Sequence, residues 1–155
     1  MLDVGTKFPE FSLKNQNGIE ENNKAFAGQW LVLYVYPKDD TPGCTLEGKG
    51  FSTTREQFEK ANVKVVGLSA DDVESHKNFC NKYSLTVDLL ADPEAKLLKK
   101  LEVGQSDYKG VKYWNRTTFV VDPNGVLRKV YTEVNPEGHE KELLEDIQGL
   151  QARHQ

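Results

Sequence analysis

Short apolar runs, rich in β-branched and aromatic residues, recur along this chain and predict buried strands. Residues 30–36 are continuously apolar, which is typical of a central strand covered on both faces. The start of the chain is more polar, and the turn signal Asn17-Gly18 within residues 8–24 indicates a small β-hairpin. The remaining runs predict strands at residues 63–68, 87–90, 112–114 and 117–121, and a hairpin that turns at 122–125 into 126–134.

Between these runs, the apolar residues take a helical spacing. Residues 44–61 have this pattern, although Gly48 and Gly50 weaken the first turns by roughly 1 kcal/mol each relative to Ala. A capping box opens a helix over residues 71–83, with Asp71 as its N-cap. Two more helices are expected at residues 93–101 and 139–152.

The order of these elements predicts the fold class. Alternating strands and helices indicate a parallel core sheet, and the late hairpin adds antiparallel strands at one side. No repeat or linker divides the chain, and its 155 residues are enough for one core. We therefore expect an α/β protein of the thioredoxin-like type, with a mixed central sheet flanked by helices and an N-terminal β-hairpin, in which residues 1–155 form a single domain.

Composition and charge exclude several classes of function. Hydrophobic residues make up 37% and charged residues 28%, which is ordinary for a globular chain and excludes a long disordered one. A net charge of −4 without a basic block argues against nucleic acid or an anionic membrane as a partner. No apolar run approaches the ~20 residues of a membrane helix, and the N-terminus lacks a secretory pattern, so we expect a cytoplasmic protein.

The two cysteines are too few for a disulfide framework, so each is either an inert apolar residue or redox-active. Cys44 follows a buried strand that ends at Pro37 and a turn that contains Thr41, and it opens the next helix. The first amides of a helix have no internal partner and carry the positive end of its dipole, which stabilises a thiolate. We therefore expect a reactive Cys44 with a depressed pKa, the alternatives being an inert cysteine and a threonine that serves only the turn.

The pattern Pro37-x-x-x-Thr41-x-x-Cys44 resembles the active-site signature of the peroxiredoxins, which are thiol peroxidases. The fuller run YPKDDTPGCT is similar to the bacterioferritin comigratory protein, or peroxiredoxin Q, group. Likeness extends over nearly the whole chain, through VGTKFPEFSL, VVGLSAD and RTTFVVDPNG. The resemblance implies that Cys44 attacks the peroxide, that Arg116 is its cationic partner, that Thr41 bonds the sulfur and the substrate, and that Pro37 shields the site.

This resemblance implies an enzyme that reduces hydrogen peroxide and organic hydroperoxides, with Cys44 becoming a sulfenic acid. An unperturbed cysteine is about 3% thiolate at pH 7, so complete ionisation would raise the rate only ~30-fold. A fast peroxidase therefore also needs donors for the charge that moves onto the peroxide oxygens, and the guanidinium of Arg116 offers several in a fixed geometry.

The second cysteine leaves two mechanisms open. Many relatives of this group have a resolving cysteine five positions after the first, where this chain has Lys49. Cys80, on the next predicted helix, resembles the resolving cysteine of a subset of the group. In that case it forms a disulfide with Cys44, after local unfolding of residues 44–50, 76–83 or both, and a thioredoxin-like dithiol recycles the enzyme. If Cys80 only fills the core, the protein is a one-cysteine peroxidase.

Other features predict little further chemistry. The three histidines, His76, His139 and His154, are not clustered in sequence, and Asp39-Asp40 is expected to be a solvated loop, so we expect no metal, haem or flavin. The chain ends soon after its last helix, which favours a monomer. A non-catalytic redox sensor or binding module on the same scaffold is the alternative from another class, and the site residues that match the family argue against it.

Overall fold

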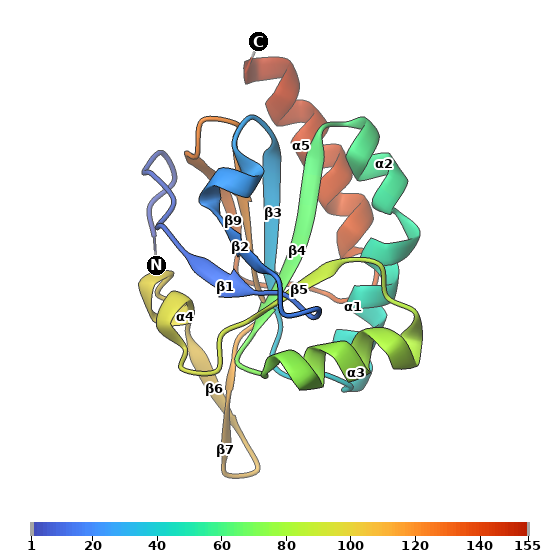
Figure 1. Ribbon diagram of the computed structural model, residues 1–155. Coiled ribbons are helices and arrows are strands. Elements are labelled where there is room, and N and C mark those ends of the chain that lie inside the picture. The colour runs from blue at the N-terminus through green and yellow to red at the C-terminus, as the bar shows by residue number, and fades with distance from the viewer. Residues whose placement is uncertain (1, 155) are drawn as a thin grey trace.

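A five-stranded mixed sheet runs through the middle of the computed structural model, which describes residues 2–154 (Figure 1). Its order is β5-β4-β3-β8-β9, with parallel pairs from β5 to β3 and antiparallel pairs from β3 to β9. This arrangement confirms the predicted thioredoxin-like fold. The five strands are β3 (Trp30–Val35), β4 (Val63–Ser69), β5 (Asp88–Ala91), β8 (Thr117–Val121) and β9 (Leu127–Tyr131).

Both faces of the sheet are covered, as the continuous apolar run in β3 predicts. Alternate side chains of β3 enter two separate apolar clusters: one includes Val32 and Tyr34, and the other Leu31 and Leu33. Helices α1, α2, α3 and α5 pack on the first face, and α4 with the N-terminal segment covers the second (Figure 1). The helices are α1 (Pro42–Thr53), α2 (Arg55–Lys60), α3 (Val73–Tyr83), α4 (Lys96–Lys100) and α5 (His139–His154), with a 3-10 helix at Asn23–Phe26.

Two small hairpins lie outside the main sheet. The predicted N-terminal hairpin is formed by β1 (Ser12–Lys14) and β2 (Glu20–Asn22). The expected strand at 112–114 is β7 (Val111–Trp114), but its partner β6 (Gln105–Tyr108) was not predicted, because its residues are all exposed and have no apolar alternation. Together β6 and β7 form an arm that projects from the body of the molecule (Figure 1).

Several predicted helix boundaries are wrong for local reasons. The helix expected at 44–61 begins at Pro42, whose ring suits the first helical position, and it is divided at Thr54 into α1 and α2. The N-cap of α3 is Asp72, which accepts a hydrogen bond from the Ser75 amide, and not Asp71. Helix α4 is shorter than the predicted 93–101. Within residues 2–154, no helix is long and apolar enough to cross a membrane.

Candidate active site

Cys44 lies near the start of the helix that follows the central strand. Strand β3 ends at Val35, and α1 begins after a loop of residues 36–41, so Cys44 is the third residue of α1 rather than the first. Thr41 is the N-cap residue, but its hydroxyl donates to the Lys38 carbonyl at 2.8 Å and bonds no amide of the helix. The first-turn amides of α1 therefore have no competitor from the N-cap side chain for an anion near the sulfur.

Arg116 reaches the sulfur from the neighbouring strand, as the family resemblance implied. Its Nη2 donates to Cys44 Sγ at 3.4 Å, across 72 residues of sequence. The register of the sheet explains this approach, because Val35 at the end of β3 pairs with Thr117 at the start of β8. The residue before Thr117 therefore lies beside the loop that leads to Cys44.

Gly43 makes room for this guanidinium. A Cβ atom at this position would lie 2.4 Å from Arg116 Nη2, closer than real Cβ contacts, and 3.3 Å from Cζ, so the guanidinium would have to shift. The backbone of Gly43 is in the ordinary helical region, so the space for Arg116 is the reason for glycine here, and not backbone freedom. The turn signal Thr41-Pro42-Gly43 gave no sign of this steric role.

The electrostatics at Cys44 correct one prediction. The residue is only 1% exposed, and burial raises the pKa of its thiol. The Arg116 cation, the Thr41 hydroxyl and the Lys38 backbone amide lower this pKa, but burial outweighs them. The expected depressed pKa is therefore wrong for this closed conformation, because sequence spacing shows the helix start but not the depth of the sulfur.

Glu47 is a site residue that sequence reasoning missed. One turn after Cys44, it is 1% exposed and accepts a hydrogen bond from Arg116 Nη1 at 2.9 Å. Burial raises the pKa of Glu47 to about 7, against the lowering effect of Arg116, and nearby Glu140 raises it further. Its second oxygen, Oε2, has no hydrogen-bond partner among the described residues. The signal in the sequence was its position three residues after Cys44, on the same side of the helix.

A groove of about 460 Å³ opens over this site. One wall is the active-site loop, where Pro37 and Thr41 lie at the edge, together with Arg116. The arm forms the other wall and contributes aromatic rings, among them Tyr113 and Trp114. Cys44 does not line the groove, but Thr41 and Arg116 do, so a small molecule in the groove would meet the guanidinium that bonds the sulfur.

Cys80 lies on α3 and is buried in the same apolar cluster as Cys44. The two thiols are free and share this cluster with Tyr34, whose pKa is raised mainly by burial. Burial, with the nearby negative charges of Asp39 and Asp88, raises the pKa of Cys80 to about 12. In this conformation Cys80 is therefore held as a neutral thiol.

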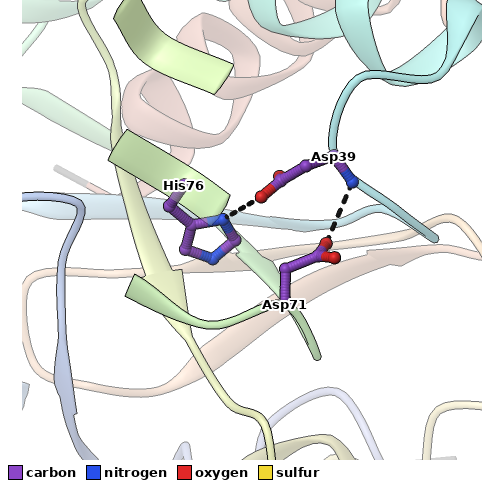
Figure 2. A group of neighbouring side chains, drawn as sticks. All are labelled: Asp39, Asp71 and His76. Carbon is purple, nitrogen blue, oxygen red and sulfur yellow. Dashed lines mark hydrogen bonds and ion pairs between the residues drawn. The ribbon is translucent and has the colours of Figure 1, made fainter. Parts of the chain in front are cut away.

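Two further predictions are corrected at the loop before Cys44. Asp39 is buried rather than solvated, and His76 is clustered with it and with Asp71 (Figure 2). His76 Nδ1 lies 2.7 Å from Asp39 Oδ2, and the Asp39 amide donates to Asp71 Oδ2 at 2.9 Å. These three residues could offer ligands to a metal ion, but a cation would have to displace these internal hydrogen bonds. Asp40 does remain exposed.

The fold and the site together define a class, namely thioredoxin-like redox proteins with one cysteine in the first turn of a helix and an arginine bonded to its sulfur. Residues 4–130 match the AhpC/TSA family. The chain belongs to this family.

Curated relatives agree with this membership. The protein named peroxiredoxin bcp in Helicobacter pylori is 41% identical over 149 residues, which cover 94% of this chain and 98% of that protein. A chloroplastic peroxiredoxin Q from Suaeda salsa is 42% identical over 96% of this chain and 69% of its own length. Because peroxiredoxins are thioredoxin-dependent peroxidases, the chain is a thiol peroxidase.

Solved structures of the same group share the fold. A cysteine-to-serine mutant of PrxQ from Xylella fastidiosa superimposes with a TM-score of 0.91 at 31% identity, over 96% of this chain and 97% of that one. The bacterioferritin comigratory protein of Xanthomonas campestris, described for its alkyl peroxide reduction activity, gives a TM-score of 0.86 at 32% identity over 96% of this chain and 97% of that one.

Proposed function

We propose that Cys44 is the residue that reduces the peroxide, and that Arg116 and Thr41 are its catalytic partners. The observation that carries this proposal is the 3.4 Å hydrogen bond from Arg116, which lines an open groove, to a sulfur in the first turn of α1. The Cys44 thiolate bonds to the terminal peroxide oxygen, the O–O bond breaks, and the second oxygen leaves as water or alcohol after it takes a proton. Cys44 is left as a sulfenic acid.

Donors to the reacting oxygens contribute to the rate, because burial of the Cys44 thiol opposes the activation that Arg116 provides. Arg116 offers fixed N–H groups to the negative charge that develops during O–O cleavage. The first-turn amides of α1 add further donors at the same place, and the Thr41 hydroxyl adds another once it turns from the Lys38 carbonyl toward the substrate. Pro37 stands at the groove edge, where it limits access of water. The substrates are hydrogen peroxide and organic hydroperoxides.

Arg116 has two buried acidic partners, Cys44 and Glu47. When Glu47 is protonated, the full positive charge of the guanidinium is available to the Cys44 thiolate. Because burial raises the pKa of Glu47 to about 7, both forms of this carboxyl exist near neutral pH. Glu47 therefore moderates how strongly Arg116 stabilises the thiolate.

We also propose that Cys80 resolves the sulfenic acid. Its thiolate attacks Cys44 Sγ, a disulfide forms, and the sulfenic oxygen leaves as water. Structures of Xanthomonas campestris peroxiredoxin Q carry serine replacements of two cysteines that are 36 positions apart, which is the separation of Cys44 and Cys80. A thioredoxin-type dithiol then reduces the disulfide. Both sulfurs are buried on separate helices, so this step requires local opening of α1, α3 or both.

Peroxide consumption with thioredoxin, thioredoxin reductase and NADPH tests the catalytic role of Cys44. We expect turnover by the parent chain and none by Cys44→Ser, whereas loss of turnover only in Cys80→Ser would contradict the assignment. Mass analysis after one equivalent of peroxide separates the two mechanisms. A Cys44–Cys80 disulfide supports the resolving role, and a persistent sulfenic acid indicates a one-cysteine enzyme. Oxidation without turnover would favour the redox sensor.

We propose that the protein is a single-domain monomer in the cytoplasm. The bacterial relatives carry no organelle in their names, whereas the plant relatives are chloroplastic. Light scattering on the purified protein, reduced and oxidised, tests the monomer directly.

A further inference from the structure

A buried cluster fastens the active-site loop to the helix that carries Cys80. We define the buried cluster as Tyr36, Asp39, Ser75 and His76. Three donors converge on the Asp39 carboxylate: the Tyr36 hydroxyl at 2.6 Å, the Ser75 hydroxyl at 2.8 Å and His76 Nδ1 at 2.7 Å. The side chains of Asp39 and His76 are 4% and 0% exposed. Figure 2 shows Asp39 on the loop and His76 on the helix, joined by this bond.

The bond between His76 and Asp39 carries a proton. On its other side, His76 Nε2 lies 2.9 Å from the Leu90 carbonyl, which can only accept, so Nε2 bears a hydrogen. Nδ1 therefore faces a carboxylate oxygen across a second short hydrogen bond that also requires a proton. Buried hydrogen bonds of this kind cost most to break, because the groups that they leave behind lose their partners away from water.

The same loop and helix also meet at the surface. Asp40 accepts from Lys82 Nζ at 2.8 Å and from the Tyr83 hydroxyl at 2.5 Å. These contacts lie on the C-terminal side of Cys80, and His76 lies one turn before it. Exposed ion pairs contribute little to stability. The buried cluster is therefore the stronger of the two attachments that hold α3 against the active-site loop.

We infer that Asp39 and His76 are positioning residues for the resolution step. Their buried bond holds α3 in place until Cys44 has reacted, and the opening of this bond limits how fast Cys80 reaches the sulfenic acid. This inference rests on the proposed roles of the two cysteines. Detachment of α3 also removes Cys80 from the negative charge of Asp39, which is one cause of its raised pKa. The chemistry of the step is unchanged: Cys44 and Cys80 join, and water leaves.

Tyr36→Phe and His76→Gln test this inference. Tyr36→Phe removes one hydroxyl that bonds Asp39 and keeps the ring that packs near Tyr34 and Phe79. His76→Gln removes the imidazole bond itself. The matched control is Lys82→Ala, on the same helix and facing the same loop, but at the exposed pair. Quenched mass analysis after one equivalent of peroxide gives the rate of Cys44 oxidation and the rate of disulfide formation separately.

We expect both cluster variants to form the disulfide at least five-fold faster and to accumulate less sulfinic acid at high peroxide, with Cys44 oxidation within two-fold of the parent. Lys82→Ala should change neither rate more than two-fold. Adding Cys80→Ser should abolish the difference in sulfinic acid. If His76→Gln fails to fold, Tyr36→Phe decides alone.

A lower melting temperature with unchanged or slower disulfide formation would overturn the inference and leave the cluster a purely structural role. This result differs from failure of the proposed function. If the proposed function failed, the parent itself would form no Cys44–Cys80 disulfide, and the inference would fail together with the proposed function.

Discussion

At the scale of single residues, the site depends on how closely Arg116 approaches Cys44. Its guanidinium spans Cys44 Sγ at 3.4 Å and Glu47 Oε1 at 2.9 Å, and it passes over Gly43 with no space to spare. A bidentate cation in a fixed place differs from a general positive charge, because each N–H points at one acceptor.

Arg116→Lys should lower the rate of peroxide reduction by a factor of roughly 100 or more while the fold is kept. Lysine retains the charge but loses the fork that serves the sulfur and the reacting oxygens together, and loss of one such donor costs on this order. Stopped-flow oxidation of Cys44 measures the effect. Arg55→Lys, in an exposed pair with Glu59, is the control and should react at the parent rate. Equal rates for both variants would show that Arg116 has no special role.

Gly43→Ala should reduce the peroxide rate at least ten-fold without a comparable loss of stability. The new methyl group would displace the Arg116 guanidinium, whereas alanine is the better helix former. Gly149→Ala on α5 is the matched control, because no atom lies within 4 Å of its added Cβ. It should add about 0.5–1 kcal/mol of stability and leave the rate unchanged. A Gly43→Ala enzyme as fast as the parent would contradict the steric role.

Glu47 makes stability depend on pH. Its folded pKa of about 7 lies above its ordinary value of 4.5, so the folded state binds this proton more tightly, and the free energy of unfolding falls as pH rises from 4.5 through about 7. This loss amounts to about 3 kcal/mol. In urea unfolding between pH 4.5 and about 7, the free energy of unfolding of Glu47→Gln should therefore fall by about 3 kcal/mol less than that of the parent.

Glu59→Gln, at an exposed carboxyl, controls for the loss of a surface charge and should follow the parent. Parallel pH profiles for the parent and Glu47→Gln would mean that Glu47 is not held in its protonated form by the folded state.

At the scale of elements, the two glycines in α1 affect the packing of the helix as well as its intrinsic stability. Gly48 and Gly50 weaken the helix, as the sequence predicts, but they also let it pack closely. A Cβ on Gly50 would lie 2.7 Å from Glu140 Oε2 of α5, and one on Gly48 would lie 3.1 Å from Leu85. Helix α1 therefore pairs low intrinsic helix propensity with close tertiary contacts.

Oxidation should open these elements selectively. Because both sulfurs are buried on separate helices, we expect residues 44–50 or 76–83 to lose hydrogen-exchange protection when the disulfide forms, while β3 at the centre of the sheet stays protected. Exchange on the reduced and the oxidised protein measures this, with Cys80→Ser treated in the same way as the control. Unchanged protection in both segments despite a confirmed disulfide would contradict the need for local opening.

At the scale of the whole molecule, the sheet order brings the site together at one end of the sheet. Strand β3 supplies the loop to Cys44, and β8, its antiparallel neighbour, begins next to Arg116. Strand β4, its parallel neighbour on the other side, leads to the turn before α3, where Asp71 binds the Asp39 amide. The Cys44–Arg116 contact therefore lies toward the β8 side of β3, and the contacts that attach α3 lie toward the β4 side.

The sequence alone determined the features that depend on local pattern. The run 30–36, the turn at 122–125 and the amphipathic helices predict the succession of strands and helices along the chain, because side-chain periodicity reports burial directly. The motif from Pro37 to Cys44 lies within eight residues, so its strand–loop–helix setting was also readable. Arg116 was named through resemblance, since nothing in its own neighbourhood points to a cysteine 72 residues away.

Only the tertiary structure decided the features that depend on desolvation and long-range register. The raised pKa of Cys44, the burial of Glu47 and the pairing of Asp39 with His76 all arise from groups that are distant in sequence and enclosed by the core. Burial works against charge wherever water is excluded, and the amount of water excluded is a property of the whole packed molecule. Local spacing therefore placed Cys44 correctly at a helix start but gave the wrong sign for its pKa.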